Sequence, residues 1–353
     1  MPQQFLDKLI DLIQKNNASD LHLVPGYPPT IRVKGRLTPL GQTAIPAKTV
    51  EEIARTLLGD DFRQFQKEKD FDSAYNWKNK LRFRVNAYYT MGNVALALRV
   101  IPNRIKTLQE LNLPTSLGEL ALQKEQGLVL VVGPTGHGKS TTIASMINLI
   151  NRTHKKHIVT LEDPIEYVFP KHLSIVSQRE IDKDAIQFHT SLRNVLREDP
   201  DVVFIGEMRD AQTIEAAITV AETGHLVFST LHTYSASQTI ERIVQSFSED
   251  KQDTIRTQLA YILEAVISQR LIPTKDGKIY PALELLLINP AVRNLIRETK
   301  FYQIDNVIKT SLSEGMFPLE YSIAKLVKQG LLDQEEAKRY AVYPDEIKYW
   351  LTT

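Results

Sequence analysis

Residues 128–141, LVLVVGPTGHGKST, decide the fold class of this 353-residue chain. The five apolar residues from Leu128 to Val132 predict a buried strand, and a helical pattern starts near Thr141. Between them, Gly133 to Ser140 match the pattern G-x-x-x-x-G-K-S. A strand, a glycine-rich loop and a helix in this order predict a P-loop, which binds the phosphates of a nucleotide.

Each residue type in this loop has a physical task at a phosphate. Glycines let backbone N–H groups turn toward phosphate oxygens, Lys139 neutralises the β- and γ-phosphates, and the Ser140 hydroxyl is a ligand for Mg2+. His137 occupies a variable position of the pattern, and we expect its side chain to point out of the loop. The nucleotide-binding residues predicted from the motif are Gly133, Pro134, Thr135, Gly136, His137, Gly138, Lys139, Ser140 and Thr141.

Downstream of the loop, buried runs alternate with helical segments, which predicts a parallel sheet with helices on both faces. The carboxyl ends of parallel strands meet at one edge of such a sheet, so residues that follow different strands are expected to lie close together. The strands predicted in this part are 158–161, 202–205, 226–230 and 282–288, and the pattern after Pro290 is helical.

Upstream of the loop, the pattern is that of a small α+β unit. A helical stretch at 5–13 precedes short strands at 21–24 and 31–37, the second with a turn at Lys34-Gly35, and a hairpin within 81–101. A chain of this length is expected to form about two domains. The predicted boundaries are an N-terminal domain over 1–102, a linker over 103–117, an α/β core over 118–290 and a C-terminal helical region over 291–353.

The amino-acid composition excludes several kinds of chemistry and bears on the compartment in which the protein works. The absence of cysteine excludes disulfides, thiolate metal sites and a cysteine nucleophile, and it is typical of a reducing compartment. Lysine and arginine number 43 and aspartate and glutamate 42, so no net field draws the chain to nucleic acid or to an anionic membrane. Apolar runs are far shorter than the roughly 20 residues of a spanning helix, and Asp7 and Asp11 interrupt the N-terminal stretch. We expect a cytoplasmic protein.

Acidic residues follow two of the predicted strands. Glu207 comes after the strand at 202–205, where P-loop proteins place a carboxylate associated with Mg2+. Glu162 and Glu166 belong to LEDPIE, residues 161–166, and either could orient an attacking water molecule. For Glu207, the alternative is that it is a surface acid at the start of a turn. For residues 161–166, the alternative is a solvated acidic turn.

Basic residues form two pairs near the predicted sheet. Arg193 and Arg197 are four residues apart, which places them on one helical face, and a solvated face is the alternative. His225 and His232 flank the strand at 226–230, and His232 follows it toward the predicted phosphate edge. For a single histidine, a structural role is the alternative to a catalytic one.

The register of the hairpin within 81–101 follows from its loop. If residues 90–93 form the loop, the numbers of paired residues sum to 183, so Arg84 faces Arg99. Two opposed cations destabilise a sheet unless an anion lies between them, and nucleotide phosphate is the anion that this chain is predicted to bind. The alternative is that both arginines extend into water.

Five motifs, taken in order, resemble the PilT family of type IV pilus retraction ATPases within the secretion ATPase superfamily. They are the P-loop, LEDPIEY at 161–167, LREDPDVVFIGEMRD at 196–210, AETGHLVFSTLHT at 221–233 and VRNLIRE at 292–298. The resemblance implies a PAS-like α+β N-terminal domain, a RecA-like core and a helical tail. It also implies a cytoplasmic homohexamer, a molecular motor that hydrolyses ATP with Mg2+. Through an inner-membrane pilus platform protein, the motor would power pilus retraction and twitching motility.

The resemblance further implies roles for single residues. Glu162 and Glu166 fall in the acidic box of the family, with Glu166 preferred as the base, and Glu207 is the Walker B glutamate. The basic residues that match the family are His225 and His232 of the histidine box, Arg84 and Arg99 of the N-terminal domain near the γ-phosphate, and the core pair Arg193 and Arg197.

Other interpretations stay open. An accessory retraction paralogue would share most of these motifs. Pilus-assembly and type II secretion ATPases are similar but usually carry a four-cysteine zinc module, and this sequence has no cysteine. From a different class, a ring NTPase that translocates nucleic acid is disfavoured by the net charge of +1. A scaffold that binds nucleotide without hydrolysis is the last alternative.

Overall fold

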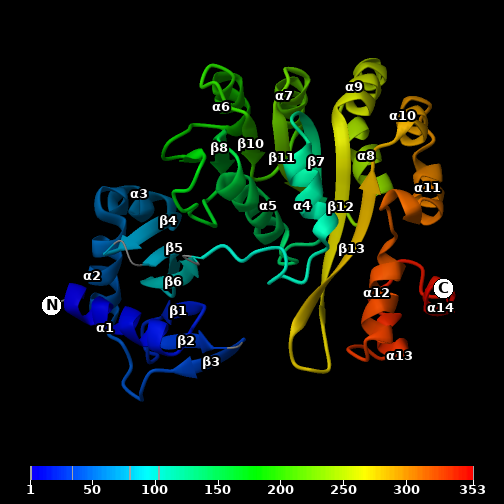
Figure 1. Ribbon diagram of the computed structural model, residues 1–353. Helices are drawn as coiled ribbons and strands as arrows, with labels where there is room; N and C mark the ends of the chain where they lie inside the picture. The colour runs from blue at the N-terminus through cyan, green and yellow to red at the C-terminus, as the bar shows by residue number, and fades with distance from the viewer. Residues whose placement is uncertain (1, 34, 79–80, 102–103, 353) are drawn as a thin grey trace. The chain divides into compact units, whose positions relative to one another are not determined.

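The computed structural model describes residues 2–33, 35–78, 81–101 and 104–352, and the chain divides into two compact units (Figure 1). Unit 1 ends at Arg104 and unit 2 begins at Ile105. In Figure 1, unit 1 is coloured from blue to cyan and unit 2 from cyan to red. The turn predicted at Lys34 and the domain end predicted at residue 102 lie outside the described residues.

Unit 1 is an antiparallel sheet with helices packed on one face. Its elements are α1 (Pro2–Lys15), β1 (Asp20–Leu23), β2 (Thr30–Val33), β3 (Arg36–Pro39), α2 (Ala47–Leu58), η1 (Gly59–Asp61), α3 (Phe62–Glu68), β4 (Asp70–Trp77), β5 (Leu81–Thr90) and β6 (Asn93–Ile101). The strand order is β3-β2-β1-β6-β5-β4. Apolar residues repeat every three to four positions along α1 and α2, so each helix buries one side against the sheet.

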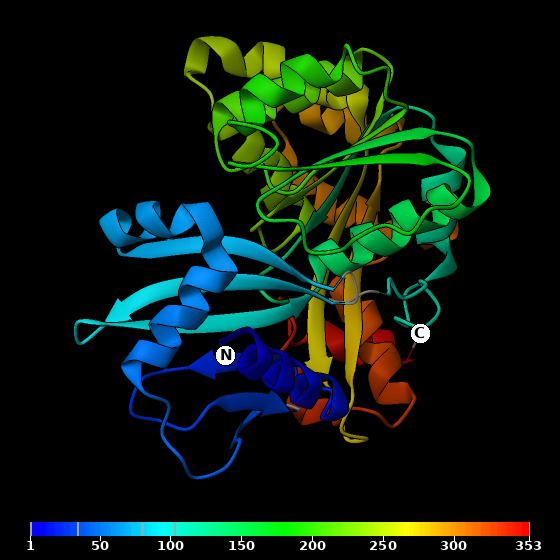
Figure 2. The same ribbon diagram turned by 90° about the vertical axis from the view of Figure 1, so that its left-hand side faces the viewer.

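The β5–β6 hairpin has the predicted register, with Tyr89 opposite Val94 and Arg84 opposite Arg99. Figure 2 shows the two strands as neighbouring cyan arrows joined by a tight turn. Thr90 also pairs with Asn93, so the turn proper is Met91-Gly92, and both residues have positive φ, as a two-residue hairpin turn requires. The face predicted to be apolar is buried at Phe83, Val85, Ala87, Leu96 and Leu98 and half-buried at Val100.

Unit 2 contains a seven-stranded sheet and most of the helices. Its strands are β7 (Gly127–Val132), β8 (His157–Glu162), β9 (Ile175–Glu180), β10 (Val202–Ile205), β11 (Leu226–Leu231), β12 (Leu263–Pro273) and β13 (Ile279–Leu287). Its helices are α4 (Thr115–Gln123), α5 (Lys139–Thr153), α6 (Phe188–Val195), α7 (Ala211–Glu222), α8 (Ala236–Gln245), α9 (Glu249–Ile262), α10 (Pro290–Arg297), η2 (Phe301–Gln303), α11 (Ile304–Thr310), η3 (Leu312–Glu314), α12 (Leu319–Lys328), α13 (Gln334–Ala337) and α14 (Glu346–Thr352).

The strand order of the unit 2 sheet is β13-β12-β7-β11-β10-β8-β9. All neighbouring pairs are parallel except β12 with β13. The predicted α/β class with a parallel sheet is therefore confirmed. The sequence pattern did not reveal β12, because α9 ends at Ile262 and the strand begins at Leu263 without a turn signal between them.

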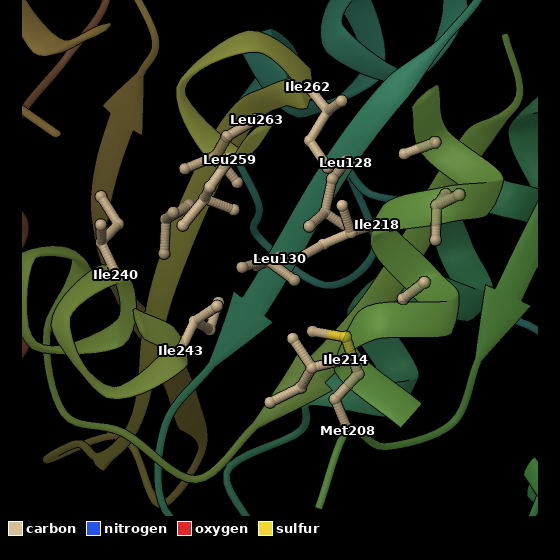
Figure 3. Packing of buried hydrophobic residues seen from close by; sticks show 14 of the residues in the cluster. Leu128, Leu130, Met208, Ile214, Ile218, Ile240, Ile243, Leu259, Ile262 and Leu263 are labelled. Carbon is tan, nitrogen blue, oxygen red and sulfur yellow. The ribbon is translucent and has the colours of Figure 1, made fainter. Parts of the chain in front are cut away.

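The sheet of unit 2 is covered on both faces. Helix α5 packs with α4 on one face, where Val129 and Val131 of β7 are buried. Leu128 and Leu130 point to the opposite face and pack against Ile214 and other residues of α7, α8 and α9 (Figure 3). Because β7 is apolar on both faces, its position in the middle of the sheet follows from its sequence.

The segment that was predicted to be a linker is part of the unit 2 core. Ile105, Leu108, Leu113 and Leu117 are buried next to α5 and the sheet. The tail after Pro290 is helical, as predicted, and α12 to α14 form a further cluster against Ile272 of β12. Over the parts of the chain that the structure describes, no helix has the length and hydrophobicity needed to span a membrane.

Candidate active site

The glycine-rich loop lies where the sequence predicts it, between Val132 at the end of β7 and Lys139 at the start of α5. Gly133 has a φ of 141°, and a Cβ atom there would lie 2.3 Å from the carbonyl oxygen of Gln269. Gly138 precedes α5 with a φ of 77°, in the left-handed region. Glycine is required at both positions, so local sterics fix the path of the loop onto the amino end of the helix.

Lys139 is the buried cation of the site, with 7% of its surface exposed. Its ammonium donates hydrogen bonds to the carbonyl oxygens of Gly133 at 2.8 Å and Pro134 at 3.1 Å. Burial lowers the pKa of Lys139, and the carboxylates of Glu207 and Glu166 oppose this shift. A buried cation at the amino end of a helix is suited to hold a polyphosphate.

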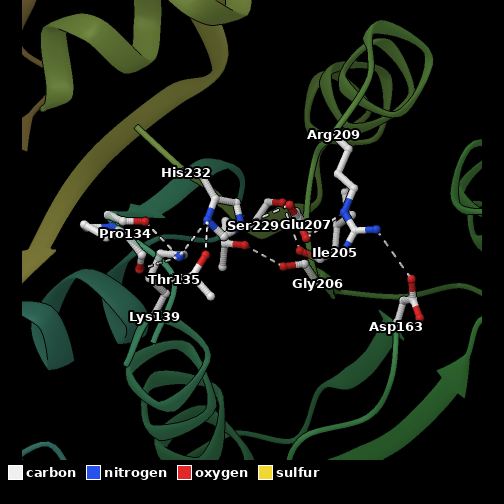
Figure 4. Close-up of polar contacts among 12 residues, drawn as sticks. Pro134, Thr135, Lys139, Asp163, Ile205, Gly206, Glu207, Arg209, Ser229 and His232 are labelled. Carbon is white, nitrogen blue, oxygen red and sulfur yellow. Dashed lines mark hydrogen bonds and ion pairs between the residues drawn. The ribbon is translucent and has the colours of Figure 1, made fainter. Parts of the chain in front are cut away.

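A chain of polar contacts links the loop to the ends of neighbouring strands (Figure 4). His232 follows β11, and its Nδ1 lies 3.1 Å from Thr135 Oγ1 while its Nε2 lies 3.0 Å from Glu207 Oε1. Glu207 follows β10 and pairs through Oε2 with Arg209 Nε at 2.8 Å. Arg209 in turn lies 3.8 Å from Asp163, directly after β8. The structure therefore brings His232 and Glu207 to the P-loop at the carboxyl edge of the sheet.

The two glutamates of the 161–166 segment have different surroundings. Glu162 is buried at the end of β8, and its Oε1 accepts hydrogen bonds from Thr160 Oγ1 at 2.7 Å and Gln178 Nε2 at 3.3 Å. Burial raises the pKa of Glu162 to about 7 against the effect of these hydrogen bonds. Glu166 is exposed, so it is the carboxylate of the pair that can reach a water molecule.

The P-loop is also held from the side of β12. Gln269 is buried, and its amide donates to the carbonyl oxygen of His137 at 2.8 Å and accepts from Thr142 Oγ1 at 2.7 Å. The Nδ1 atom of His137 accepts a hydrogen bond from the backbone N–H of Leu271 at 2.9 Å. The ring of His137 thus points away from the loop and contacts a strand that the sequence pattern did not reveal.

Three of the predicted site residues take no part in the contacts described around the P-loop. They are Arg193, Arg197 and His225. Arg193 lies on α6 but Arg197 follows the end of that helix, and both are exposed. Neither has a side-chain hydrogen bond or ion pair with any residue that the structure describes. His225 lies at the amino end of β11, where its Nδ1 is 3.0 Å from the Val220 carbonyl oxygen and 3.1 Å from Thr223 Oγ1. The structure therefore does not bring His225 to the P-loop edge of the sheet.

Arg84 and Arg99 face each other in unit 1, but each has a carboxylate partner of its own. Arg84 Nη2 lies 3.0 Å from Asp72 Oδ2 on β4, and Arg99 Nε donates to Asp20 Oδ1 on β1 at 2.8 Å. The inference that the two arginines need an external anion is therefore wrong, because the adjacent strands supply the negative charge.

Sequence reasoning missed some residues of the site. Arg209 and Asp163 lie inside the quoted motifs, but their ion pair depends on the order of strands β8 and β10 in the sheet. No sequence motif marks Gln269, because its place next to Gly133 results from the pairing of β12 with β7. Asp20 lies just before the strand predicted at 21–24, and its pairing with Arg99 follows from the register of β1 and β6.

The residues at this edge fit a nucleotide with Mg2+. The loop backbone passes so close to β12 that a Cβ atom at Gly133 would clash, and Lys139 is buried. Both features suit the binding of a phosphate chain. Within the described ranges, no three or more histidine, aspartate and glutamate side chains are grouped to hold a metal ion. Mg2+ often takes many of its ligands from phosphate and water and only one or two from protein. The protein groups available to it are the hydroxyl of Ser140 in the first turn of α5 and the carboxylate of Glu207.

Known proteins resemble the chain over most of its length. The family model described as type II/IV secretion system protein matches residues 2–303. A twitching motility protein of Neisseria gonorrhoeae is 43% identical over 323 residues, which are 91% of this chain and 86% of the relative. The type IV pilus retraction ATPase PilT of Pseudomonas aeruginosa is 40% identical over 341 residues, which are 96% of this chain and 99% of the relative.

A solved structure has the same fold. The crystal structure of the pilus retraction motor PilT with bound ADP has a TM-score of 0.91 and 43% identity, and it covers 97% of this chain and 98% of that chain. This match confirms an N-terminal α+β unit, a RecA-like core and a helical tail. The chain therefore belongs to the type II/IV secretion system protein family and, within it, to the PilT family of type IV pilus retraction ATPases.

Proposed function

We propose that this protein hydrolyses ATP as a ring of six identical subunits in the cytoplasm and uses the energy to retract type IV pili. The observation that carries the proposal is the set of contacts at the carboxyl edge of the unit 2 sheet. There, His232 lies within hydrogen-bonding distance of Thr135 and the buried Lys139 of the P-loop and also of Glu207. Family membership supports the biological role.

Each residue at this edge has a proposed task in hydrolysis. Backbone N–H groups of the P-loop and Lys139 hold the phosphate chain, and Ser140 with Glu207 holds Mg2+, which neutralises charge that develops on the phosphates. Glu166, the exposed acid, accepts the proton of the attacking water. His232 bridges Thr135 and Glu207, so it keeps the loop and this carboxylate in register.

Arginines complete the proposed site across the subunit boundary. Arg84 and Arg99 act on the nucleotide that the neighbouring subunit holds, and Arg193 and Arg197 add positive charge from the core. All four side chains are at least partly exposed, and Arg193 and Arg197 have no acid partner among the described residues. An arginine supplied by another subunit makes hydrolysis depend on assembly of the ring.

The motion of the subunits would reach the pilus through a partner protein in the membrane. We propose that the ring acts on an inner-membrane platform protein of the pilus and itself meets the membrane only through that partner. The segment 292–298 on α10 has no phosphate-binding chemistry and is the proposed coupling element. The related branches that assemble pili or assist retraction would use the same catalytic edge, so the direction of pilus movement is a property of the partner contacts.

The proposal is tested with the purified full-length chain. Light scattering should give the mass of six subunits, and the assembled fraction should release phosphate from ATP only when Mg2+ is added. A piliated strain without this chain should keep surface pili but lose twitching motility. No ATP turnover by the hexamer would support the non-hydrolysing scaffold instead. Strong stimulation by DNA at moderate salt would support the nucleic-acid-translocating class.

A further inference from the structure

Strand β12 extends beyond its partner β7, and the P-loop takes the place of that partner. The ladder between the two strands ends at Ser268 opposite Val132, whereas β12 continues to Pro273. A strand edge that loses its partner leaves backbone donors that need new acceptors. Leu271, three residues beyond the end of the ladder, donates its N–H to the imidazole Nδ1 of His137 at 2.9 Å.

His137 is held at two points by β12. Its carbonyl oxygen accepts from the buried amide of Gln269 at 2.8 Å, and its ring accepts from Leu271. The same Gln269 lies below Gly133, the first glycine of the loop. The loop therefore rests on β12 through Gln269 at its beginning and through His137 at its end.

We propose that His137 is a positioning residue for nucleotide binding, whose neutral imidazole ties the P-loop to strand β12 through the N–H of Leu271. This inference rests on the proposed nucleotide site and adds to it a residue that acts through the loop backbone. Residue 137 precedes Gly138 and Lys139, so the bond fixes the part of the loop that turns into α5. Fixed N–H groups at a helix amino end bind phosphate more tightly than mobile ones, because their ordering has already occurred.

The bond requires one protonation state of the ring. Nδ1 accepts a hydrogen bond only in the neutral tautomer that carries its proton on Nε2. A second proton would make Nδ1 a donor that faces the Leu271 donor. Burial, followed by the positive charges of Arg270 on β12 and Lys139 on α5, lowers the pKa of His137. The tether is therefore present at neutral pH and is lost in acid.

The test compares three variants with the wild-type hexamer. His137→Leu keeps much of the size of the ring but removes the acceptor. His137→Asn keeps an acceptor oxygen at the position of Nδ1 and cannot take up a proton. His172→Asn changes an exposed histidine outside the site and is the matched control. The measurements are the dissociation constant of ADP, kcat and KM for ATP, and the unfolding temperature, each at pH 8 and at pH 5.

At pH 8, His137→Leu should bind ADP about five- to tenfold more weakly, the usual value of one hydrogen bond, with a smaller change in kcat than in KM. His137→Asn should bind within about twofold of wild type, which is well below the value of one hydrogen bond. Between pH 8 and pH 5, wild type and His172→Asn should lose affinity by a larger factor than His137→Asn does.

The proposal is overturned if His137→Leu binds ADP as tightly as wild type, or if His137→Asn is as weak as His137→Leu. It is also overturned if wild type and His137→Asn weaken equally in acid. If His137→Leu does not fold, the pH comparison between wild type and His137→Asn decides. A wild-type hexamer that binds no ADP would refute the proposed function itself, and this inference with it.

Discussion

The carboxyl edge of the unit 2 sheet and the polar face of the unit 1 sheet both concentrate charge, but they hold it differently. In unit 2, Lys139 is buried, and the contact of Gly133 with Gln269 fixes the loop around it. In unit 1, Arg84 and Arg99 pair with acids on adjacent strands, and 71% of the Arg99 side chain is exposed. The cation of unit 2 is buried in a closely packed loop, whereas the guanidinium groups of unit 1 are reached by water.

The difference indicates which region holds a ligand and which can change partners. The exposed pair of Arg84 and Asp72 contributes only about 0 to 1 kcal/mol, so replacing Asp72 by a phosphate costs little free energy, whereas Asp20 is buried and holds Arg99 more firmly. The ammonium of Lys139 is buried and donates to two carbonyl oxygens, and a hydrogen bond to a charged group contributes about 1.5 to 3 kcal/mol, so these contacts do not open readily. A buried nucleotide site in unit 2 and an exchangeable Arg84 in unit 1 suit the mechanism that we propose, in which the site would be completed and opened in every cycle.

The largest effect should follow from removing the fixed charge. Lys139→Ala should lower kcat/KM for ATP by at least about a hundredfold, because the β- and γ-phosphates lose the cation of the P-loop. Lys348→Ala, at an exposed position away from the site, is the control. Phosphate release by the two variants over a range of ATP concentrations checks this. Equal kcat and KM in both would remove the P-loop from the mechanism.

Next in size should be the loss of the two carboxylates that we propose to act on water and Mg2+. Glu166→Gln and Glu207→Gln should each lower kcat by about 10²- to 10⁴-fold, the range for a general acid or base, while ATP still binds. Binding of a fluorescent ATP analogue and single-turnover hydrolysis separate the two steps, with exposed Glu241→Gln as the control. If both variants changed KM alone, the proposed roles would be wrong.

Mixed rings test whether the exchangeable Arg84 acts on a neighbouring subunit. Arg84→Ala alone should be slowed by up to about 10³-fold, as for an arginine that stabilises phosphoryl transfer. Combined with Lys139→Ala chains, it should recover activity, because some boundaries pair an intact Lys139 with an intact Arg84. Fluorescence transfer between labelled subunits confirms exchange. Mixed rings that exchange subunits and remain inactive would show that the arginine acts within its own chain.

A buried acid in unit 2 and an ion-paired acid in unit 1 should change the free energy of unfolding in opposite directions as pH changes. Burial raises the pKa of Glu284 on β13 to about 7, and Asp305 and Glu320 add to the shift. Burial alone would raise the pKa of Asp20, but hydrogen bonds from Arg99 and Ser19 hold it below its usual value. Folded Glu284 thus binds its proton more tightly than unfolded Glu284, so its contribution to stability is complete below about pH 4.5 and is lost as pH rises through 7.

Glu284→Gln should therefore raise the free energy of unfolding at pH 8 by on the order of 1 to 3 kcal/mol and leave it nearly unchanged at pH 4.5. Glutamine keeps an oxygen that can accept the hydrogen bond from the Ala236 N–H. Asp20→Asn should have the opposite sign, with a loss at pH 8 that shrinks as pH falls below the pKa of an unfolded aspartate. Denaturant titrations at the two pH values measure both. A Glu284→Gln chain that is less stable than wild type at pH 8 would contradict this account.

The smallest effect on hydrolysis should come from α10. Ile296 is fully buried in the core, so its replacement would change stability as well as function. Leu295 is half-buried and is the better position to alter. Leu295→Ala should reduce twitching motility strongly and ATP turnover by less than about twofold, because α10 carries no phosphate-binding chemistry. Equal loss of both activities in an intact hexamer would argue against a coupling role.

Patterns that are local in sequence predicted most of the fold and part of the site. The P-loop, the strand at 202–205 and the pairing of Arg84 with Arg99 each depend on a few consecutive residues or on one turn. Contacts that depend on the order of strands could not be predicted in this way. The partners of Arg84 and Arg99 come from β4 and β1, and the support of the P-loop comes from β12, whose sequence continues the helical pattern of α9.

The two-residue turn at Met91-Gly92 limits how relatives of this chain can change during evolution. Met91 is 98% exposed, so packing does not restrict its side chain and only its positive φ disfavours β-branched residues, whereas the length of the turn is fixed. One inserted or deleted residue would shift β6 by one position against β5 and exchange its two faces. Arg99 would enter the apolar core and Leu98 would face Asp20. Substitutions at the tip should therefore be common in the lineage, and insertions or deletions of single residues should be rare.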